Sequence, residues 1–186
     1  MADAPTDGIA VRETTAADVR GVRRVARRSW TAAYGDALDG ETVDRAMAEW
    51  YDPEALRDLI ERGDVEHLVA VDPDAAREGY AAGSDRADPT ESVVGYAGGG
   101  VERSTGSVAA LYVAPERWGE GIGTRLVERL LAALRDRGAE RAEVRVLAAN
   151  DVGRSFYESR RFDAVEERGT DLFGEPCTEV TYARPL

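Results

Sequence analysis

Leu111–Thr124 reads LYVAPERWGEGIGT, an apolar strand that runs through a proline into a glycine loop and then directly into a helix. The glycines Gly119, Gly121 and Gly123 let the backbone approach a ligand without side chains in between. The helix is predicted to begin near Ile122, where its first N–H groups lack intrahelical partners and its dipole favours negative charge. The pattern indicates an anion site, with an ordinary strand-to-helix turn as the alternative.

Two common nucleotide loops are excluded, because each requires certain residue types at fixed offsets. A Walker loop ends in Lys followed by Ser or Thr, and the chain contains no lysine. A dinucleotide fingerprint needs Gly or Ala three residues after its second glycine, where this chain has Thr124 or Leu126, depending on the frame. The anion is therefore held in some other way.

The segment Trp118–Gly123 resembles the acyl-CoA loop of the GCN5-related N-acetyltransferases (GNAT), in which Gln or Arg is followed by two residues, Gly, one residue, and Gly or Ala. Trp118 stands where the family usually has Gln or Arg, and Arg117 or Arg125 could supply that phosphate contact instead, whereas the backbone part of the loop does not depend on it. The resemblance implies acetyl-CoA as co-substrate and no metal. The cofactor contacts it implies are Leu111, Tyr112, Val113, Trp118, Gly119, Glu120, Gly121, Ile122, Gly123, Thr124 and Asn150.

A second segment at the expected distance extends the resemblance. Apolar residues from Ile122 to Leu134 recur at helical spacing until Gly138, and a strand is predicted over 143–147. The run 150–162 then resembles the family's next motif, an Asn followed by a short helix that carries Phe-Tyr-Glu. Asn150 and Tyr157 are seven residues apart, about two helical turns, so both can face one cleft. By resemblance, Asn150 holds the cofactor arm and Tyr157 stands near the thioester sulfur.

The beginning of the chain also fits the family. A short strand is predicted over 9–12, and Thr14 or Thr15 can cap a helix that continues to Tyr34. In the family this helix forms part of the wall of the acceptor pocket. Trp30 and Tyr34 lie four residues apart on one helical face, so they are candidates either for acceptor binding or for the core.

The resemblance covers nearly the whole chain and implies an α/β (α+β) fold with a mixed, mostly antiparallel sheet of seven strands and about four helices. We expect a single N-acetyltransferase domain over 1–186, with its core at about 9–184 and a long loop at 72–91. The strands at 107–113 and 143–147 are expected to run parallel and splay apart, with the pantetheine arm paired to backbone groups of Leu111 and Val113. The remaining elements predicted are helices at 41–50 and 53–62, strands at 66–71, 92–101, from 162 and at 178–182, and a loop at 169–176.

Composition places limits on function and location. The 36 acidic against 24 basic residues give a formal net charge of -12, which argues against nonspecific nucleic-acid binding. No apolar run approaches membrane length, no signal region is evident, and the lone Cys177 excludes an intramolecular disulfide, so a cytoplasmic location and no membrane partner are expected. Abundant Asp, Glu and Arg without lysine resemble the cytosolic proteins of extreme halophiles, with a very GC-rich genome as the alternative explanation.

The chemistry implied by the resemblance is attack of an amine on a thioester. Backbone N–H groups near Leu111 and Tyr112 would stabilise the oxyanion. Tyr157, protonated at neutral pH, either donates a proton to the leaving thiolate or only packs on the cofactor. The base is open between Glu102, which a solvated turn would equally explain, and a water relay. His67 is expected at the edge of its strand and away from the chemistry, and Arg145 argues against the ribosomal-protein subtype.

The sequence thus predicts transfer of an acetyl group from acetyl-CoA to a primary amine of a small molecule or a protein, in a direct ternary complex. The alternative is a non-catalytic acyl-CoA sensor, favoured by the missing base. The acceptor itself, the role of the 72–91 loop and the choice between a monomer and a homodimer are not determined by the sequence.

The charge balance yields a first prediction. Because like charges destabilise a compact state and salt shortens the Debye length from about 8 Å at physiological ionic strength to about 3 Å at 1 M, the melting temperature is expected to rise as KCl increases over that range. Calorimetric melting measures it. A melting temperature that stays constant or falls would contradict self-repulsion as a main destabilising factor.

Overall fold

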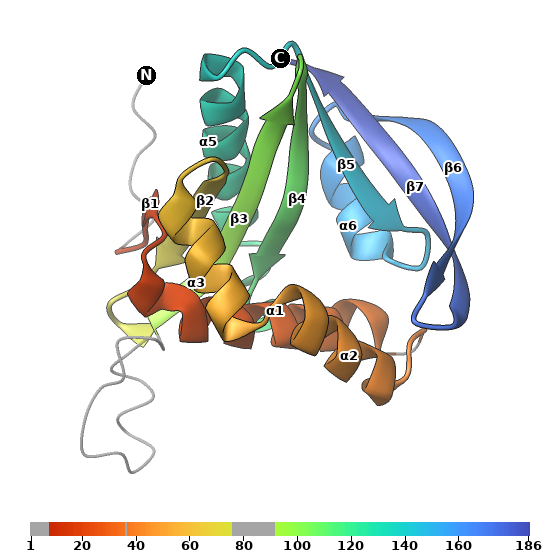
Figure 1. Ribbon diagram of the computed structural model, residues 1–186, viewed down its shortest axis with the longest axis horizontal. Coiled ribbons are helices and arrows are strands. Elements are labelled where there is room, and N and C mark those ends of the chain that lie inside the picture. Colours follow the sequence, from red (N-terminus) through yellow and green to blue (C-terminus); the bar gives the residue numbers. More distant parts are fainter. Residues whose placement is uncertain (1–7, 36, 76–91) are drawn as a thin grey trace.

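A computed structural model describes residues 8–35, 37–75 and 92–186. A sheet of seven strands in the order β1-β2-β3-β4-β5-β7-β6 forms its centre, and only the β4–β5 pair is parallel (Figure 1). The strands are β1 (Ala10–Glu13), β2 (Glu66–Val71), β3 (Val93–Glu102), β4 (Thr105–Val113), β5 (Arg141–Leu147), β6 (Asp163–Leu172) and β7 (Glu175–Pro185). The expected mixed, mostly antiparallel sheet is confirmed.

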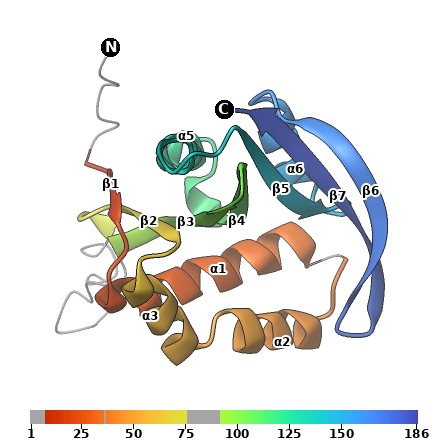
Figure 2. The same ribbon diagram turned by 45° about the horizontal axis from the view of Figure 1, so that its top comes forward.

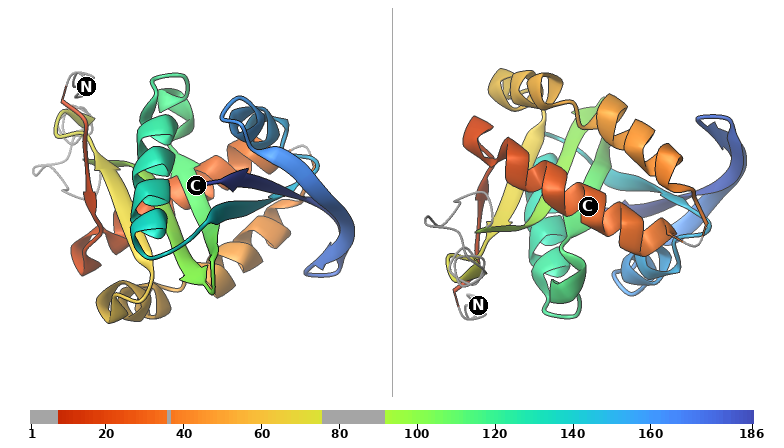
Figure 3. Two further views of the ribbon diagram at one scale, coloured as in Figure 1. Left: turned by 90° about the horizontal axis from the view of Figure 1, so that it is seen from above. Right: turned by 90° about the horizontal axis from the view of Figure 1, so that it is seen from below.

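Five α-helices in the described ranges cover the two faces of the sheet, rather than about four. They are α1 (Val19–Tyr34), α2 (Gly40–Trp50), α3 (Pro53–Arg62), α5 (Ile122–Asp136) and α6 (Asp151–Glu158). Helices α1 and α2 lie on one face and α5 on the other (Figures 2 and 3). None of the described helices combines the length and the apolar character needed to cross a membrane.

Helix α5 shows how the apolar spacing produces the packing. Residues Ile122, Leu126, Leu130 and Leu134 recur every four positions, and each is at most 1% exposed, because together they form the stripe that packs against the sheet. On the opposite face, Val22, Val25 and Ala26 of α1 belong to a second apolar cluster that includes Tyr96 and Tyr112. The sheet thus separates two cores.

The middle of β4 contains a β-bulge. Gly98 pairs with Ala110 and Gly99 pairs with Val108, so Ala109 has no partner on β3. In a regular strand Val108 and Leu111, three residues apart, would point to opposite faces of the sheet. Because of the extra residue, both pack on the α5 side. Gly99 permits the close approach, because a Cβ there would lie 2.2 Å from the carbonyl oxygen of Ser107.

The bulge coincides with the point where β4 and β5 separate. Their parallel pairing extends only from Thr105↔Arg141 to Val108↔Val144. Beyond it, β5 continues along β7 to Leu147, and β4 continues along β3 to Val113. The diverging strands are visible at the centre of Figure 1, and they confirm the predicted splay between the two strands.

The predicted loop at 169–176 is wrong. Strand β6 continues to Leu172, and β7 already begins at Glu175, so only Phe173 and Gly174 form the turn. Most of β6 is exposed because it forms the edge of the sheet, and the apolar alternation by which a half-buried strand is recognised is therefore weak. Of the long loop predicted at 72–91, residues 76–91 lie outside the described ranges.

Two adjacent glycines of β3 test the role of the bulge. We expect Gly99→Ala to lower the free energy of unfolding by about 2 kcal/mol, because its Cβ collides with the Ser107 carbonyl. Gly100→Ala is the matched control, since its Cβ would meet only Val65, at 3.4 Å. Urea denaturation of both variants measures the difference. Equal stabilities would show that the close contact at Gly99 is not a constraint.

Candidate active site

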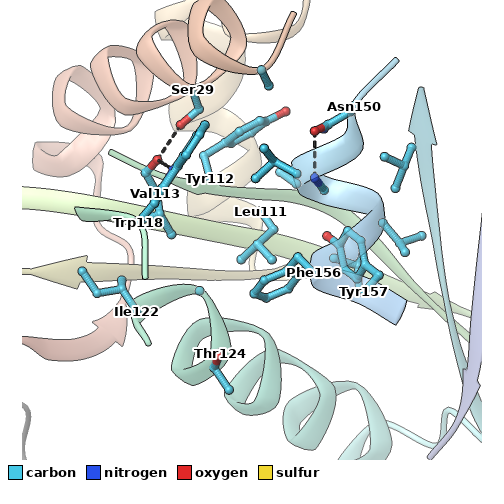
Figure 4. A pocket seen from close by; sticks show the side chains of 18 of the residues that line it. Ser29, Leu111, Tyr112, Val113, Trp118, Ile122, Thr124, Asn150, Phe156 and Tyr157 are labelled. Atoms are coloured by element: carbon cyan, nitrogen blue, oxygen red, sulfur yellow. Dashed lines mark hydrogen bonds between the residues drawn. The ribbon is translucent and has the colours of Figure 1, made fainter. Parts of the chain in front are cut away.

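A pocket of about 380 Å³ lies where β4 and β5 separate, bounded by the glycine loop, the start of α5, α6 and the end of α1 (Figure 4). It brings together all but one of the site residues predicted from the sequence: Trp30, Tyr34, Leu111, Tyr112, Val113, Trp118, Gly119, Gly121, Ile122, Gly123, Thr124, Asn150 and Tyr157. The exception is Glu120, whose carboxylate instead accepts a hydrogen bond from Arg117 at 2.7 Å.

The two arginines expected to replace a Gln or Arg at position 118 are both engaged elsewhere. Arg117 binds Asp72 and Glu120, each at 2.7 Å, and these hydrogen bonds raise the pKa of its guanidinium. Arg125 donates to the backbone oxygen of Ile9 at 3.0 Å. Ile9 precedes β1 and Asp72 follows β2, so both arginines connect the neighbourhood of the glycine loop to the end of the ladder where Ala10 pairs with Val71.

The three glycines of the loop have different physical roles. Gly119 and Gly121 adopt φ values of 85° and 79°, and a Cβ on either would meet no atom within 4 Å. Their conformation favours glycine, and the space beside them is open. Gly123 instead packs against Phe156, whose ring would lie 3.1 Å from a Cβ. The third glycine therefore joins α5 to α6.

The end of β4 is anchored through the carbonyl oxygen of Val113. This oxygen accepts hydrogen bonds from Ser29 Oγ of α1 and from Trp118 Nε1, both at 2.8 Å (Figure 4). The indole of Trp118 thus fixes the loop to the strand, a role that its position in the motif did not indicate.

The splay leaves backbone donors of β4 without a strand partner. The N–H of Ala114 donates to Val94 on β3, so by alternation the N–H groups of Leu111 and Val113 point away from β3. Strand β5 is no longer paired there. These two donors therefore face the pocket, whose wall contains both residues together with the glycine loop.

Arg160 is a pocket residue that the sequence analysis missed. Its guanidinium lies 3.7 Å from the centre of the Phe156 ring, donates to the backbone oxygen of Phe156 at 2.9 Å and contacts the hydroxyl of Thr124 in the first turn of α5. Burial lowers the pKa of this guanidinium, although it stays cationic at neutral pH. The available signal was the spacing of four residues between Phe156 and Arg160.

Asn150 joins α6 to α1. Its Oδ1 accepts from the N–H of Gly153 at 2.8 Å and caps α6, while its Nδ2 donates to the hydroxyl of Tyr34 at 3.0 Å. Burial raises the pKa of Tyr34 to about 12, with partial opposition from the bond to Asn150. Tyr34 therefore remains a neutral hydroxyl that orients the amide.

Tyr157 is 6% exposed and packs edge-on against Phe156 and Phe162. Its hydroxyl has no hydrogen-bond partner among the described residues, and the side chain lines the pocket (Figure 4). Burial, and then the proximity of Tyr112 and Tyr34, raise the pKa of this phenol well above its ordinary value. The site therefore contains a proton donor that keeps its proton at neutral pH.

A larger pocket of about 1200 Å³ opens on the opposite face of the sheet. It shares wall residues with the first pocket, so the two meet across the splay; the shared residues are Trp30, Tyr34, Val108, Ala109, Ala110, Tyr112 and Arg145. Trp30 and Tyr34 thus border both spaces and also belong to the apolar core of this face. Both roles predicted for them are compatible with their positions.

Aromatic rings bridge one end of this second pocket. Trp50 of α2 packs edge-on against Trp30, and Phe173 in the β6–β7 turn lies 5.4 Å from Trp50 between ring centres. A hydrogen bond from Thr42 to Glu175 joins the same two elements. Helix α2 is thereby connected to the tip of the hairpin.

Of the acid–base candidates on this side, Glu102 is exposed at the β3–β4 hairpin, where it pairs with Thr105. Its carboxylate lies at the rim of the second pocket. His67 is the second residue of β2, as expected near the end of its strand, but it is only 8% exposed and lies in the pocket wall. Arg145, on β5, is largely exposed.

Comparison with known proteins agrees with this geometry. Residues 44–162 match the model of the acetyltransferase (GNAT) family. The structure is similar to the paiA N-acetyltransferase of Thermoplasma acidophilum in complex with coenzyme A (TM-score 0.75, 22% identity, covering 96% of this chain and 99% of that one). It is also similar to an N-acetyltransferase from Staphylococcus aureus (TM-score 0.68, 17% identity, 96% and 99% covered). No curated protein sequence shows significant similarity.

The chain therefore belongs to the GNAT acetyltransferase family. The likeness to solved structures, at 22% identity or below, shows the fold alone. Family membership and the pocket together support transfer of an acyl group from acyl-CoA.

Arg160 provides a test of the cofactor side. We expect Arg160→Met to weaken coenzyme A binding roughly tenfold, about 1.4 kcal/mol, because the guanidinium is a cation beside the first turn of α5. Titration calorimetry measures the affinity. Arg154→Met is the matched control, because Arg154 lies on α6, which ends two residues before Arg160, and binds Tyr182 and Ala148 outside the pocket. An equal loss in both variants would assign the effect to helix stability.

Proposed function

We propose that this protein transfers an acetyl group from acetyl-CoA to a primary amine in a direct ternary complex. The observation that carries the proposal is the meeting of two pockets across the β4–β5 splay, with the Tyr157 hydroxyl in the wall of the first. A donor bound in one pocket and an acceptor bound in the other would approach each other through this gap.

The residues of the first pocket suit coenzyme A. The open space beside Gly119 and Gly121, together with the free N–H groups of the first turn of α5, suits a diphosphate. The N–H of Val113 and the carbonyl oxygen of Leu111, which by alternation both point away from β3, can pair with the amides of a pantetheine arm as an added strand would. The thioester would then lie at the splay, near Tyr157.

The chemistry requires three proton or charge events. The acceptor ammonium must lose a proton, the tetrahedral oxyanion needs donors, and the thiolate must be neutralised. Of the backbone N–H groups near Leu111 and Tyr112, only that of Leu111 faces the pocket, because that of Tyr112 points toward β3 by the same alternation, so the Leu111 N–H is proposed as the oxyanion donor. Tyr157 is proposed as the general acid for the thiolate, since its hydroxyl is unpartnered within the described chain and stays protonated.

The second pocket is proposed as the acceptor site. Its walls combine aromatic rings with arginine and carboxylate side chains, a setting in which an ammonium group can be held over ring faces and against acidic groups. An amine of a small molecule and an amino group of a protein both fit this description. The strongly acidic composition further supports a cytoplasm of high ionic strength as the place where the protein works.

A non-catalytic acyl-CoA sensor is the second candidate. It is favoured by one observation: β4 carries no carboxylate among its nine residues, so no acid lies on the strand next to the proposed thioester. A sensor would bind acetyl-CoA and gain thermal stability from it, but no amine would release coenzyme A.

The two candidates differ in thiol release. With acetyl-CoA and a panel of primary amines in molar KCl, we expect free coenzyme A to appear, measured with a thiol reagent, and kcat to fall about 100-fold in Tyr157→Phe while the Kd for acetyl-CoA stays unchanged. Because burial raises the pKa of Tyr157, the wild-type rate should not decline through loss of this proton below about pH 10.

Tyr182→Phe serves as control, because Tyr182 is an equally buried tyrosine whose hydroxyl binds Glu158 and Arg154 outside both pockets. Turnover of Tyr157→Phe at the wild-type rate would remove Tyr157 from the mechanism. Heat-stabilisation by acetyl-CoA without any thiol release would favour the sensor.

A further inference from the structure

The only histidine of the chain forms a short hydrogen bond inside the second pocket. His67 Nδ1 lies 2.6 Å from the hydroxyl of Tyr96 on β3, and the two rings are stacked. His67 is 8% exposed and Tyr96 is 3% exposed, and both line the pocket. The second ring nitrogen, His67 Nε2, is buried and has no hydrogen-bond partner among the described residues.

The register of the sheet places this pair beside the splay. A Cβ at Gly98 would lie 2.8 Å from the Tyr96 hydroxyl and 3.2 Å from His67 Nδ1, so the absence of a side chain at Gly98 makes room for the pair. Gly98 is paired with Ala110 on β4, about 4.8 Å away. Ala110 lines both pockets. The Tyr96 hydroxyl is therefore one strand away from the junction through which an acceptor would reach the thioester.

The pair is neutral at pH 7 and can accept one proton. Burial lowers the pKa of His67, although Glu66 and Asp64 oppose this effect, and burial together with Tyr112 raises the pKa of Tyr96. Glu66 is itself neutralised by Arg137 at 2.7 Å. The remaining charged groups of the pocket wall nearby are Glu102 and Arg103 at the hairpin, and α3 contributes only Leu56 and Leu59.

The carboxylates of the pocket are less suited to the same task. Glu143 is ion-paired with Arg141 at 2.8 Å, and Glu179 with Arg168 at 3.0 Å. Glu102 is exposed at the hairpin, and Glu166 and Asp171 are exposed on β6. The ion-paired carboxylates are already held by guanidinium groups, and the exposed ones are surrounded by water.

We propose that Tyr96 and His67 form the path that removes the proton from the acceptor ammonium, a step that rests on the proposed function above. The Tyr96 oxygen accepts the ammonium proton while its own proton passes to His67 Nδ1. The freed amine lone pair forms the C–N bond to the thioester carbon. The C–S bond then breaks, and the thiolate takes the proton of Tyr157.

The remaining protons balance. The nitrogen of the tetrahedral intermediate still carries one proton more than the amide, and the phenolate of Tyr157 takes it back. His67 returns its added proton through Tyr96 to water in the pocket. The net products are the acetamide, coenzyme A and one proton. Tyr96 touches the acceptor and is a catalytic residue, whereas His67 acts through Tyr96.

The proposal makes the effect of the pair depend on whether the acceptor arrives protonated. Benzylamine is protonated at neutral pH and aniline is not, so only benzylamine needs the path. We expect Tyr96→Phe and His67→Gln each to lower kcat about 100-fold with benzylamine and less than about threefold with aniline, with the Kd for acetyl-CoA unchanged. Tyr182→Phe, which alters a buried tyrosine outside both pockets, is the matched control and should leave both rates unchanged, and Glu102→Gln tests the carboxylate at the pocket rim.

Equal losses for the two amines would overturn the path and indicate a structural role for the pair. A loss confined to Glu102→Gln would assign the base to that carboxylate. If the wild type releases no coenzyme A with any amine, the path and the proposed function fail together, whereas wild-type turnover with unaffected pair variants removes only the path.

A second measurement needs no turnover. Because the chain has one histidine, the ring nitrogens of His67 give unambiguous NMR signals in protein labelled with nitrogen-15. We expect a neutral ring at pH 7 with its proton on Nε2, so that Nδ1 accepts from Tyr96, and a changed Nδ1 signal in Tyr96→Phe. A proton on Nδ1, or a doubly protonated ring at pH 7, would overturn the proposal.

Discussion

One extra residue in β4 is the constraint on which the site depends. Ala109 has no partner on β3, and the β4–β5 pairing ends at the residue before it. The N–H groups of Leu111 and Val113 are left facing a gap, and the same gap joins the spaces on the two faces of the sheet. The bulge in turn requires Gly99, because any side chain there collides with the Ser107 carbonyl. A single close contact between two strands thus determines where the two pockets meet, and with it where the proposed donor and acceptor would approach each other.

Much of the fold was predictable from the sequence because its signals are local. The glycine loop and the apolar spacing predicted a helix beginning near Ile122, and α5 begins at that residue. The strand predicted over 66–71 has those bounds. The β6–β7 hairpin was misjudged, since an edge strand exposed on most of its length has charged and polar residues where periodicity would otherwise appear. Its turn was too short to be recognised by composition alone.

The contacts inside the site were less predictable, because they depend on pairing between distant segments. Nothing local indicates that Trp118 would donate to Val113, that Asn150 would bind Tyr34, or that Arg117 would be held by Asp72. The stacking of His67 on Tyr96 requires the register of β2 against β3, which a strand pattern does not specify. Residue types suggested which groups gather at the splay, and the register decided what each of them binds.

The ion pairs of the described chain are all made by arginine, on helices, strands and the glycine loop alike. A guanidinium keeps its proton up to strongly alkaline pH and has no free lone pair for a thioester carbon. The sequence contains no lysine, so no side chain of this protein ends in a primary amine that could attack an acyl thioester. The protein therefore cannot acylate itself on lysine, a reaction that would consume acyl-CoA and remove positive charge from the surface.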